Sequence, residues 1–123
     1  MMRLLALSLA ASAVAVACAS GPPKPADPAL VRGWEVYQQK HCSTCHRIGD
    51  DGGGTGGPAL THLGTAAAGR APGMSAEDYV RESIVDPGAY VVPGYPDTMP
   101  RGQARDLSPD DVDALVRYLL SLK

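Results

Sequence analysis

The clearest periodic pattern of apolar residues lies at the end of the chain. From residue 112 onward, apolar side chains recur every three or four positions, which places them on one face of an α-helix. They are Val112, Leu115, Val116, Leu119 and Leu122. Ser108 is a favourable N-cap and Pro109 a favourable first helical residue. Asp110 and Asp111 follow, where negative charge suits the helix dipole. The pattern predicts a C-terminal helix over residues 109–122.

Two further helices are predicted from their first residues. Asp27 followed by Pro28 is typical of a helix start, and apolar side chains at 30, 34 and 37 share one face up to about Lys40. In this helix we expect Trp34 to belong to the core. Residues 75–78 (SAED) resemble a capping box, so a second helix begins after Ser75 and ends before residue 87, a proline.

The remaining segments indicate loops. Residues 50–57 (DDGGGTGG) and 88–99 are rich in Gly and Pro, and residues 62–74 form a loop or a short helical turn. No segment alternates between apolar and polar residues as a strand does. The chain is therefore expected to be all-α, with three main helices, long loops and no sheet.

Composition adds one requirement to this picture. The chain has 123 residues, 45% of them apolar and 20% charged, which suits a single globular domain. It has 14 Gly, 11 Pro and no Phe, so a core this small needs crosslinks, a metal or a buried cofactor. The net charge of −2 without a basic cluster argues against a nucleic-acid partner.

The N-terminus is typical of an exported protein. Residues 1–17 combine a basic Arg3 with an apolar stretch too short to span a membrane, which indicates a signal peptide. Small residues precede Cys18, as in the lipobox of bacterial lipoproteins, so we expect lipidation at Cys18. Ordinary cleavage after the Ala-Val-Ala sequence is the alternative. Residues 18–27 are Pro-rich and are expected to tether residues 28–123 to a membrane.

The motif that carries chemistry is Cys42-Ser-Thr-Cys45-His46. C-x-x-C-H is the attachment signature of c-type haem. In a helical segment, the spacing of the two thiols matches that of the haem vinyl groups to which they add. His46 is then brought under the iron as an axial ligand.

Three other functions of this motif remain open from sequence. A thioredoxin-like dithiol requires a preceding strand, whereas a helix is predicted here. A zinc site would recruit Cys42, Cys45, His46 and His62, but lacks a second pair of ligands. A disulfide between the two cysteines would close a very small loop. We favour covalent haem.

With this motif in place, the sequence resembles the small class I c-type cytochromes. The landmarks are a helix entering CSTCH, then residues 57–60 (GPAL), then Met99-Pro100 in a loop, then an amphipathic last helix. Residues 93–100 (PGYPDTMP) are similar to the Met loop of cytochrome c domains associated with terminal oxidases. The resemblance implies a helical domain over residues 28–123, wrapped around one covalently bound haem c.

The resemblance also implies residue roles. Cys42 and Cys45 carry the thioethers, and His46 and Met99 are the axial ligands of the iron. The carbonyl of Pro58 accepts the other ring N–H of His46. A His/Met ligand pair raises the reduction potential.

Further positions follow from the same resemblance. Gly33 and Tyr37 match the family's small and aromatic pair on the first helix, which packs against an aromatic residue of the last helix, here Tyr118. Met74 and His62 are rival candidates for the second axial ligand. Met74 directly precedes a helix cap, and His62 lies only sixteen residues after His46, so Met99 is preferred.

The implied function is electron transfer without enzymatic catalysis. We expect a one-electron carrier of a respiratory chain, working between a quinol-oxidising complex and a terminal oxidase or reductase. Its location is the periplasmic or cell-surface side of a bacterial membrane. Two alternatives remain: a haem subunit of a larger respiratory complex, or a haem enzyme or sensor if Met99 does not bind the iron.

Overall fold

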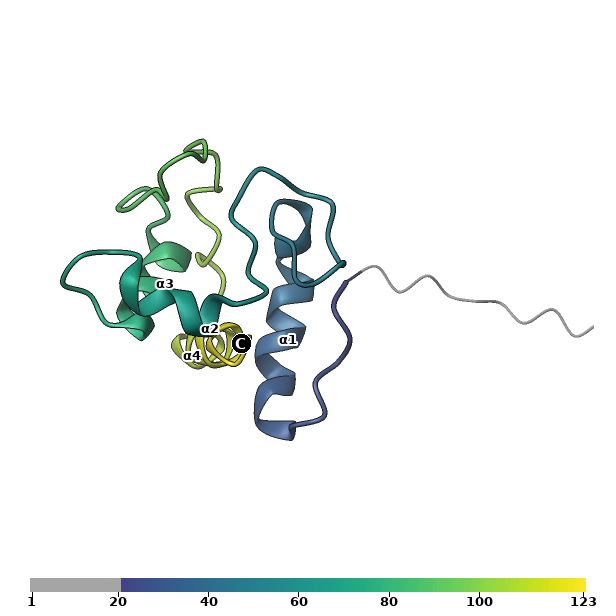
Figure 1. Ribbon diagram of the computed structural model, residues 1–123. Coiled ribbons are helices and arrows are strands. Elements are labelled where there is room, and N and C mark those ends of the chain that lie inside the picture. Colours follow the sequence, from purple (N-terminus) through teal and green to yellow (C-terminus); the bar gives the residue numbers. More distant parts are fainter. Residues whose placement is uncertain (1–20) are drawn as a thin grey trace, which may run out of the picture.

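The computed structural model describes residues 21–123 (Figure 1). Its α-helices are α1 (Pro28–Gln39), α2 (Leu63–Ala66), α3 (Ala76–Val85) and α4 (Pro109–Leu120). Two single 3₁₀ turns, Cys42–Thr44 and Ala67–Gly69, complete the regular structure of this part of the chain. Within it the only β-type pairing is an isolated bridge between Ile48 and Asp51. The expected all-α fold with three main helices and long loops is confirmed, and α2 is the short helical turn expected within residues 62–74.

The three main helices begin where the sequence predicts, because each has a side-chain cap. Asp27 accepts a hydrogen bond from the amide of Ala29 (2.9 Å). Ser75 and Ser108 accept from the amides three residues later, at 3.0 and 3.1 Å. These bonds satisfy amides that have no partner inside the helix. The helix ends are less well predicted, since α4 stops at Leu120 rather than Leu122.

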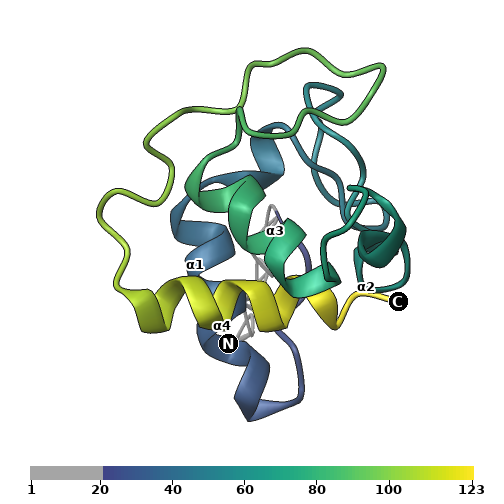
Figure 2. The same cartoon turned by 90° about the vertical axis from the view of Figure 1, so that its left-hand side faces the viewer.

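The crossing of α1 and α4 is the most extensive helix contact in the described chain (Figure 2). A methyl group added at Gly33 of α1 would collide with the backbone carbonyl of Ala114 on α4, so the two backbones touch where Gly33 has no side chain. Beside this contact the rings of Tyr37 and Tyr118 meet edge to face, with centroids 5.9 Å apart. The contact expected between these three residues is present.

The apolar face of α4 supplies much of the core. Val112, Leu115, Val116 and Leu119 are buried, and each contributes about 1.5–3 kcal/mol by leaving water. Leu122 is only partly buried, because it lies beyond the helix. The α3 helix packs on α4 and adds Tyr79, Val80 and Ile84 to the core.

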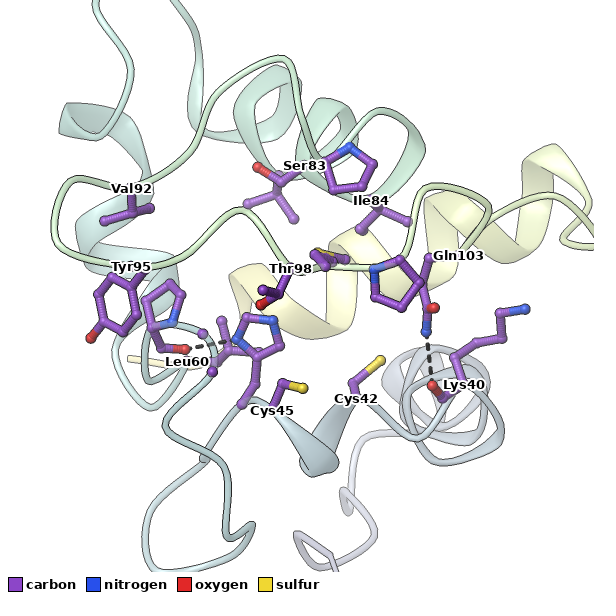
Figure 3. Close-up of a pocket in the computed structure, with 18 of the residues that line it drawn as sticks. Lys40, Cys42, Cys45, Leu60, Ser83, Ile84, Val92, Tyr95, Thr98 and Gln103 are labelled. Atoms are coloured by element: carbon purple, nitrogen blue, oxygen red, sulfur yellow. Dashed lines mark hydrogen bonds between the residues drawn. The ribbon is translucent and has the colours of Figure 1, made fainter.

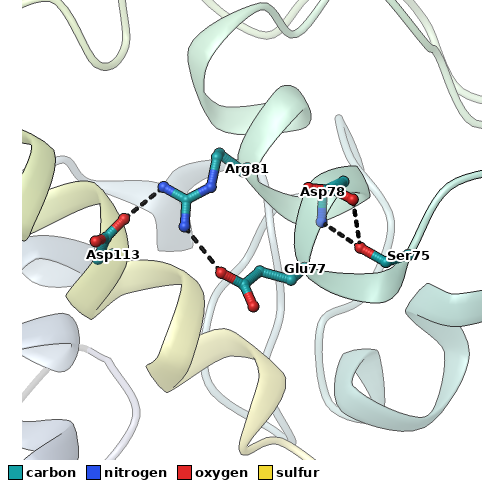
Figure 4. A network of polar contacts seen from close by, with 5 residues as sticks. All are labelled: Ser75, Glu77, Asp78, Arg81 and Asp113. Carbon is teal, nitrogen blue, oxygen red and sulfur yellow. Dashed lines mark hydrogen bonds and ion pairs between the residues drawn. The ribbon is translucent and has the colours of Figure 1, made fainter.

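A network of ion pairs joins α3 and α4 (Figure 4). Arg81 of α3 binds Glu77 one turn earlier (3.0 Å) and Asp113 of α4 (2.5 Å). These side chains are 36–64% exposed, so the pairs contribute little to stability.

The segment before α1 turns back along that helix. The carbonyl of Pro22 accepts hydrogen bonds from the indole of Trp34 (2.8 Å) and the side-chain amide of Gln38 (3.4 Å). Trp34, expected in the core, is partly buried beneath this segment. The expected signal peptide (1–17) and Cys18 lie outside the described residues, as do the first residues of the expected tether. No helix within residues 21–123 has the length and apolar character needed to cross a membrane.

Candidate functional site

A cavity of about 350 Å³ opens between the helices and the long loops (Figure 3). Its walls come from the end of α1, the CSTCH turn, residues 56–60, α3, residues 87–100 and α4. Leu60, Leu63, Val80, Ile84, Leu115 and Leu119 give it a largely apolar lining. The fold therefore holds a large apolar space next to the motif, instead of filling it with side chains.

His46 lines this cavity with its ring fixed by one hydrogen bond. Its Nδ1 lies 2.8 Å from the carbonyl oxygen of Pro58. Because a carbonyl only accepts, Nδ1 carries the proton and Nε2 keeps its lone pair for a metal. Burial lowers the pKa of His46, partly opposed by the bond to Pro58, which favours the neutral imidazole.

Gly57 is required for this placement of the ring. A methyl group at Gly57 would collide with Cε1 of His46. The amide of Gly57 also donates to the carbonyl of Cys45 (3.0 Å), and the hydroxyl of Tyr37 donates to the carbonyl of His46 (3.3 Å). The CSTCH turn is thus fixed both to α1 and to residues 57–58.

Cys42 and Cys45 lie on a single helical turn, which is closed by hydrogen bonds to the carbonyl of Cys42. The amides of Cys45 and His46 both donate to the carbonyl of Cys42, at 3.2 and 3.0 Å. Both thiols line the cavity and are free (Figure 3). Burial raises the pKa of Cys42 to about 11, whereas a redox-active dithiol lowers the pKa of its attacking thiol.

The remaining alternatives from sequence find no geometric support. The dithiol alternative requires a strand before the motif, but the helix α1 precedes it. Among residues 21–123, no three His, Cys, Asp or Glu side chains come together as a metal site would require. His62, the fourth ligand of the zinc alternative, is exposed and lies outside the cavity lining.

Met99 lies in the same cavity as His46. It is partly buried in a segment whose other residues from 93 to 102 are exposed. Figure 3 shows Cys42 and Cys45 on one side of the space and the adjacent Thr98 on the loop that crosses it. Met74, the rival thioether, packs against the core and does not line the cavity.

The loop around Met99 is closed by a local ion pair. Arg101 binds Asp97 at 2.5 Å, and its guanidinium lies against Gly88, where a methyl group would collide with it. Sequence reasoning missed two other residues at the cavity wall, Lys40 and Gln103. The side-chain amide of Gln103 donates to the backbone carbonyl of Lys40 (2.8 Å), 63 positions away. No local sequence pattern signals such a contact.

The residues present fit a covalently bound haem. Two thiols, a neutral imidazole with a free Nε2 and a thioether all face one apolar cavity. In c-type cytochromes an imidazole and a thioether bind the haem iron, whereas the two thiols attach to the macrocycle. Cys42 and Cys45 would hold the macrocycle, and the apolar lining would exclude water from it.

Comparison with known proteins agrees with this fit. The family model described as cytochrome c matches residues 30–123. The chain is also 29% identical over 104 residues to cytochrome c oxidase subunit 2 of Alkalihalophilus pseudofirmus. That match covers 81% of this chain and 28% of the relative, so the chain spans less than a third of the relative's length.

Proposed function

The chain belongs to the cytochrome c family and carries a covalently bound haem c, and from this premise we propose that it is a one-electron carrier of a respiratory chain. When bound, the haem supplies the chemistry, since its iron gains and loses a single electron. Electron transfer is the general activity of the family. The finer proposal is that His46 and Met99 are the two axial ligands, which leaves no open position for catalysis.

One observation carries the proposal: His46 and Met99 line the same cavity, while the rivals Met74 and His62 do not. The bond from Nδ1 to Pro58 directs the basic nitrogen of His46 to the metal. The Met99 thioether is neutral and soft, so it favours the ferrous state and raises the reduction potential. A closed coordination sphere suits electron exchange and excludes small ligands.

The proposed partners are a quinol-oxidising complex as donor and a terminal oxidase or reductase as acceptor. The similarity to an oxidase subunit also favours a second candidate function, a haem subunit held within a larger respiratory complex. Purification from native membranes distinguishes the two. A carrier elutes by itself after mild detergent extraction, whereas a complex subunit elutes with its oxidase.

We also propose that the protein is exported and anchored by lipid at Cys18, on the periplasmic or cell-surface side of a bacterial membrane. Small residues before Cys18 and the Pro-rich segment after it support this. Intact-mass measurement of membrane-derived protein tests it. We expect a diacylated or triacylated chain beginning at Cys18, and an unmodified N-terminus would contradict the anchor.

Haem attachment and ligand exclusion together test the proposed function. A haem-stained denaturing gel should keep its colour, with one haem per chain by pyridine haemochrome, and Cys45→Ser should retain at most a single thioether. The reduced wild-type protein should keep its visible spectrum under carbon monoxide. Rapid carbon monoxide binding would instead favour a haem enzyme or sensor.

A further inference from the structure

Lys40 connects the two walls of the cavity that carry the proposed haem ligands. It follows α1 as its C-cap residue and lies two positions before Cys42. Its carbonyl accepts a hydrogen bond from the side-chain amide of Gln103 (2.8 Å; Figure 3), and its Nζ binds Asp106 (2.5 Å). Gln103 and Asp106 follow Met99 by four and seven positions. Lys40 therefore holds residues 96–107, here called the Met99 segment, at two points.

Among residues 21–123, no other hydrogen bond or ion pair joins the Met99 segment to α1. Within residues 96–107 the hydrogen bonds are local, such as Arg101 to Asp97 and the amide of Gln103 to the carbonyl of Pro100. Within the part of the chain that the structure describes, the bonds that leave this segment end on Lys40. Apart from the packing of Ala104 and Leu107 on the core, the polar contacts that fix the segment against α1 thus depend on one residue.

Lys40 is itself held firmly. Its amide bonds to the carbonyls of Val36 and Gln38 at the end of α1, and α1 is fixed by its crossing with α4. The Lys40 side chain is only 13% exposed, whereas that of Asp106 is 70% exposed. The Gln103 bond is partly buried and independent of salt, but the Asp106 pair is open to screening by ions.

We propose that Lys40 is a positioning residue for the sixth iron ligand, a role that rests on the proposed ligation by Met99. By holding Gln103 and Asp106, it keeps the Met99 segment closed over the cavity and lowers the population of states in which the thioether has left the iron. An added ligand that competes with Met99 measures that population directly, because it binds only the open state.

The test is a titration of the ferric holoprotein with imidazole, followed by the loss of the far-red iron–sulfur absorption band. Gln103→Ala should lower the apparent Kd for imidazole about fivefold, the effect of one net hydrogen bond. Asp106→Asn should lower it less, and this effect should vanish at about 1 M salt. Asp106→Glu should restore the wild-type Kd.

Asp113→Asn is the matched control. It breaks an ion pair of the same 2.5 Å length, between Arg81 and Asp113, which joins α3 to α4 and makes no hydrogen bond or ion pair with residues 96–107. We expect its imidazole Kd to equal that of the wild type. Asp106 is exposed at the surface, so its variant folds even if Gln103→Ala does not.

The outcomes separate this inference from the proposed function. If the wild type shows the band, but Gln103→Ala and Asp106→Asn bind imidazole no more tightly than Asp113→Asn, the role of Lys40 is wrong and the electron-carrier proposal stands. If the ferric wild type lacks the band, ligation by Met99 is wrong and both proposals fall.

Discussion

Two regions of the molecule are built in opposite ways. At the α1–α4 crossing, backbones meet at Gly33, and the side chains around it, such as Val36, Tyr37 and Val116, are buried almost completely. The segment from residue 87 to 107 has no regular structure, and most of its side chains are exposed. The crossing is held by dry packing. The segment is held by a few hydrogen bonds, two of them to Lys40, and by the packing of Ala104 and Leu107.

This difference indicates that the α1–α4 crossing stabilises the fold, whereas residues 87–107 open more easily. A close-packed crossing tolerates little change, because its atoms have nowhere to move. A loop with few buried contacts opens at a lower free energy than the core. The crossing therefore fixes His46 through α1 and Tyr37. The loop places Met99 at the cavity, and under the proposed ligation it would set how long the thioether stays bound.

Loss of the haem should have the largest effect, and it should separate the two regions. Cys42→Ala with Cys45→Ala prevents attachment. We expect unfolding free energy to fall by about 4 kcal/mol or more, the linkage expected of a tightly held ligand. Hydrogen exchange should show residues 87–107 unprotected while α1 and α4 keep partial protection. Equal protection of the loop and the helices in the haem-free protein would show that the two regions do not differ in stability.

Gly33→Ala should break the crossing itself. The new methyl group meets the backbone of Ala114, which cannot move aside as a side chain can, so we expect a loss of about 2–3 kcal/mol by chemical denaturation. Gly53→Ala is the control, since nothing lies within 4 Å of a methyl group there, and it should change stability by less than about 0.5 kcal/mol. Similar losses in both variants would mean that the crossing is not tight.

Ser108→Ala should weaken the start of α4 by about 1 kcal/mol, because the amide of Asp111 loses its partner. Ser108→Thr, which keeps a hydroxyl acceptor, should recover most of this stability. The measurement is the urea midpoint of the two holoproteins. The imidazole Kd should stay unchanged in both, since the cap belongs to the helical region. A large change in that Kd would show that the two regions are coupled.

The smallest expected effect concerns acid. The guanidinium of Arg32 binds Asp111 at 2.7 Å and lowers the pKa of that carboxyl below its usual 3.8. The folded state thus favours the ionised form. The resulting stability is present above pH 3.8 and disappears as the pH falls through the lowered pKa. Wild type should slightly exceed Asp111→Asn in urea stability near neutral pH, and the difference should shrink as the pH falls below 3.8. A difference that persists in acid would assign the effect to packing.

Local signals predicted much of this structure. The starts of all three main helices were predicted because the caps Asp27, Ser75 and Ser108 act within three residues. The CSTCH motif is equally local. The end of α4 was not predicted, because the chain leaves the helix where the carbonyl of Leu122 accepts the amide of Gly64 (2.7 Å), a long-range contact.

The cavity wall shows the same limit. Sequence identified Met99 through resemblance, but its presence in one cavity with His46 depends on the path of the whole loop. Lys40 and Gln103 carried no signal, since a backbone carbonyl is an acceptor at any residue type. The residues predicted from sequence belong to a local motif or a family resemblance, whereas Lys40 and Gln103 meet only through the fold.

The proposed function rests on ligation of the iron by Met99, which the far-red charge-transfer band of the ferric protein reports. We expect the band in the wild type and in Met74→Ala, and its loss in Met99→Ala, with a lower reduction potential and new carbon monoxide binding to the reduced form. Met74→Ala is the matched control, because it removes a thioether that packs on the core outside the cavity. A wild-type protein without the band, or a Met99→Ala protein that keeps it, would show that Met99 does not bind the iron.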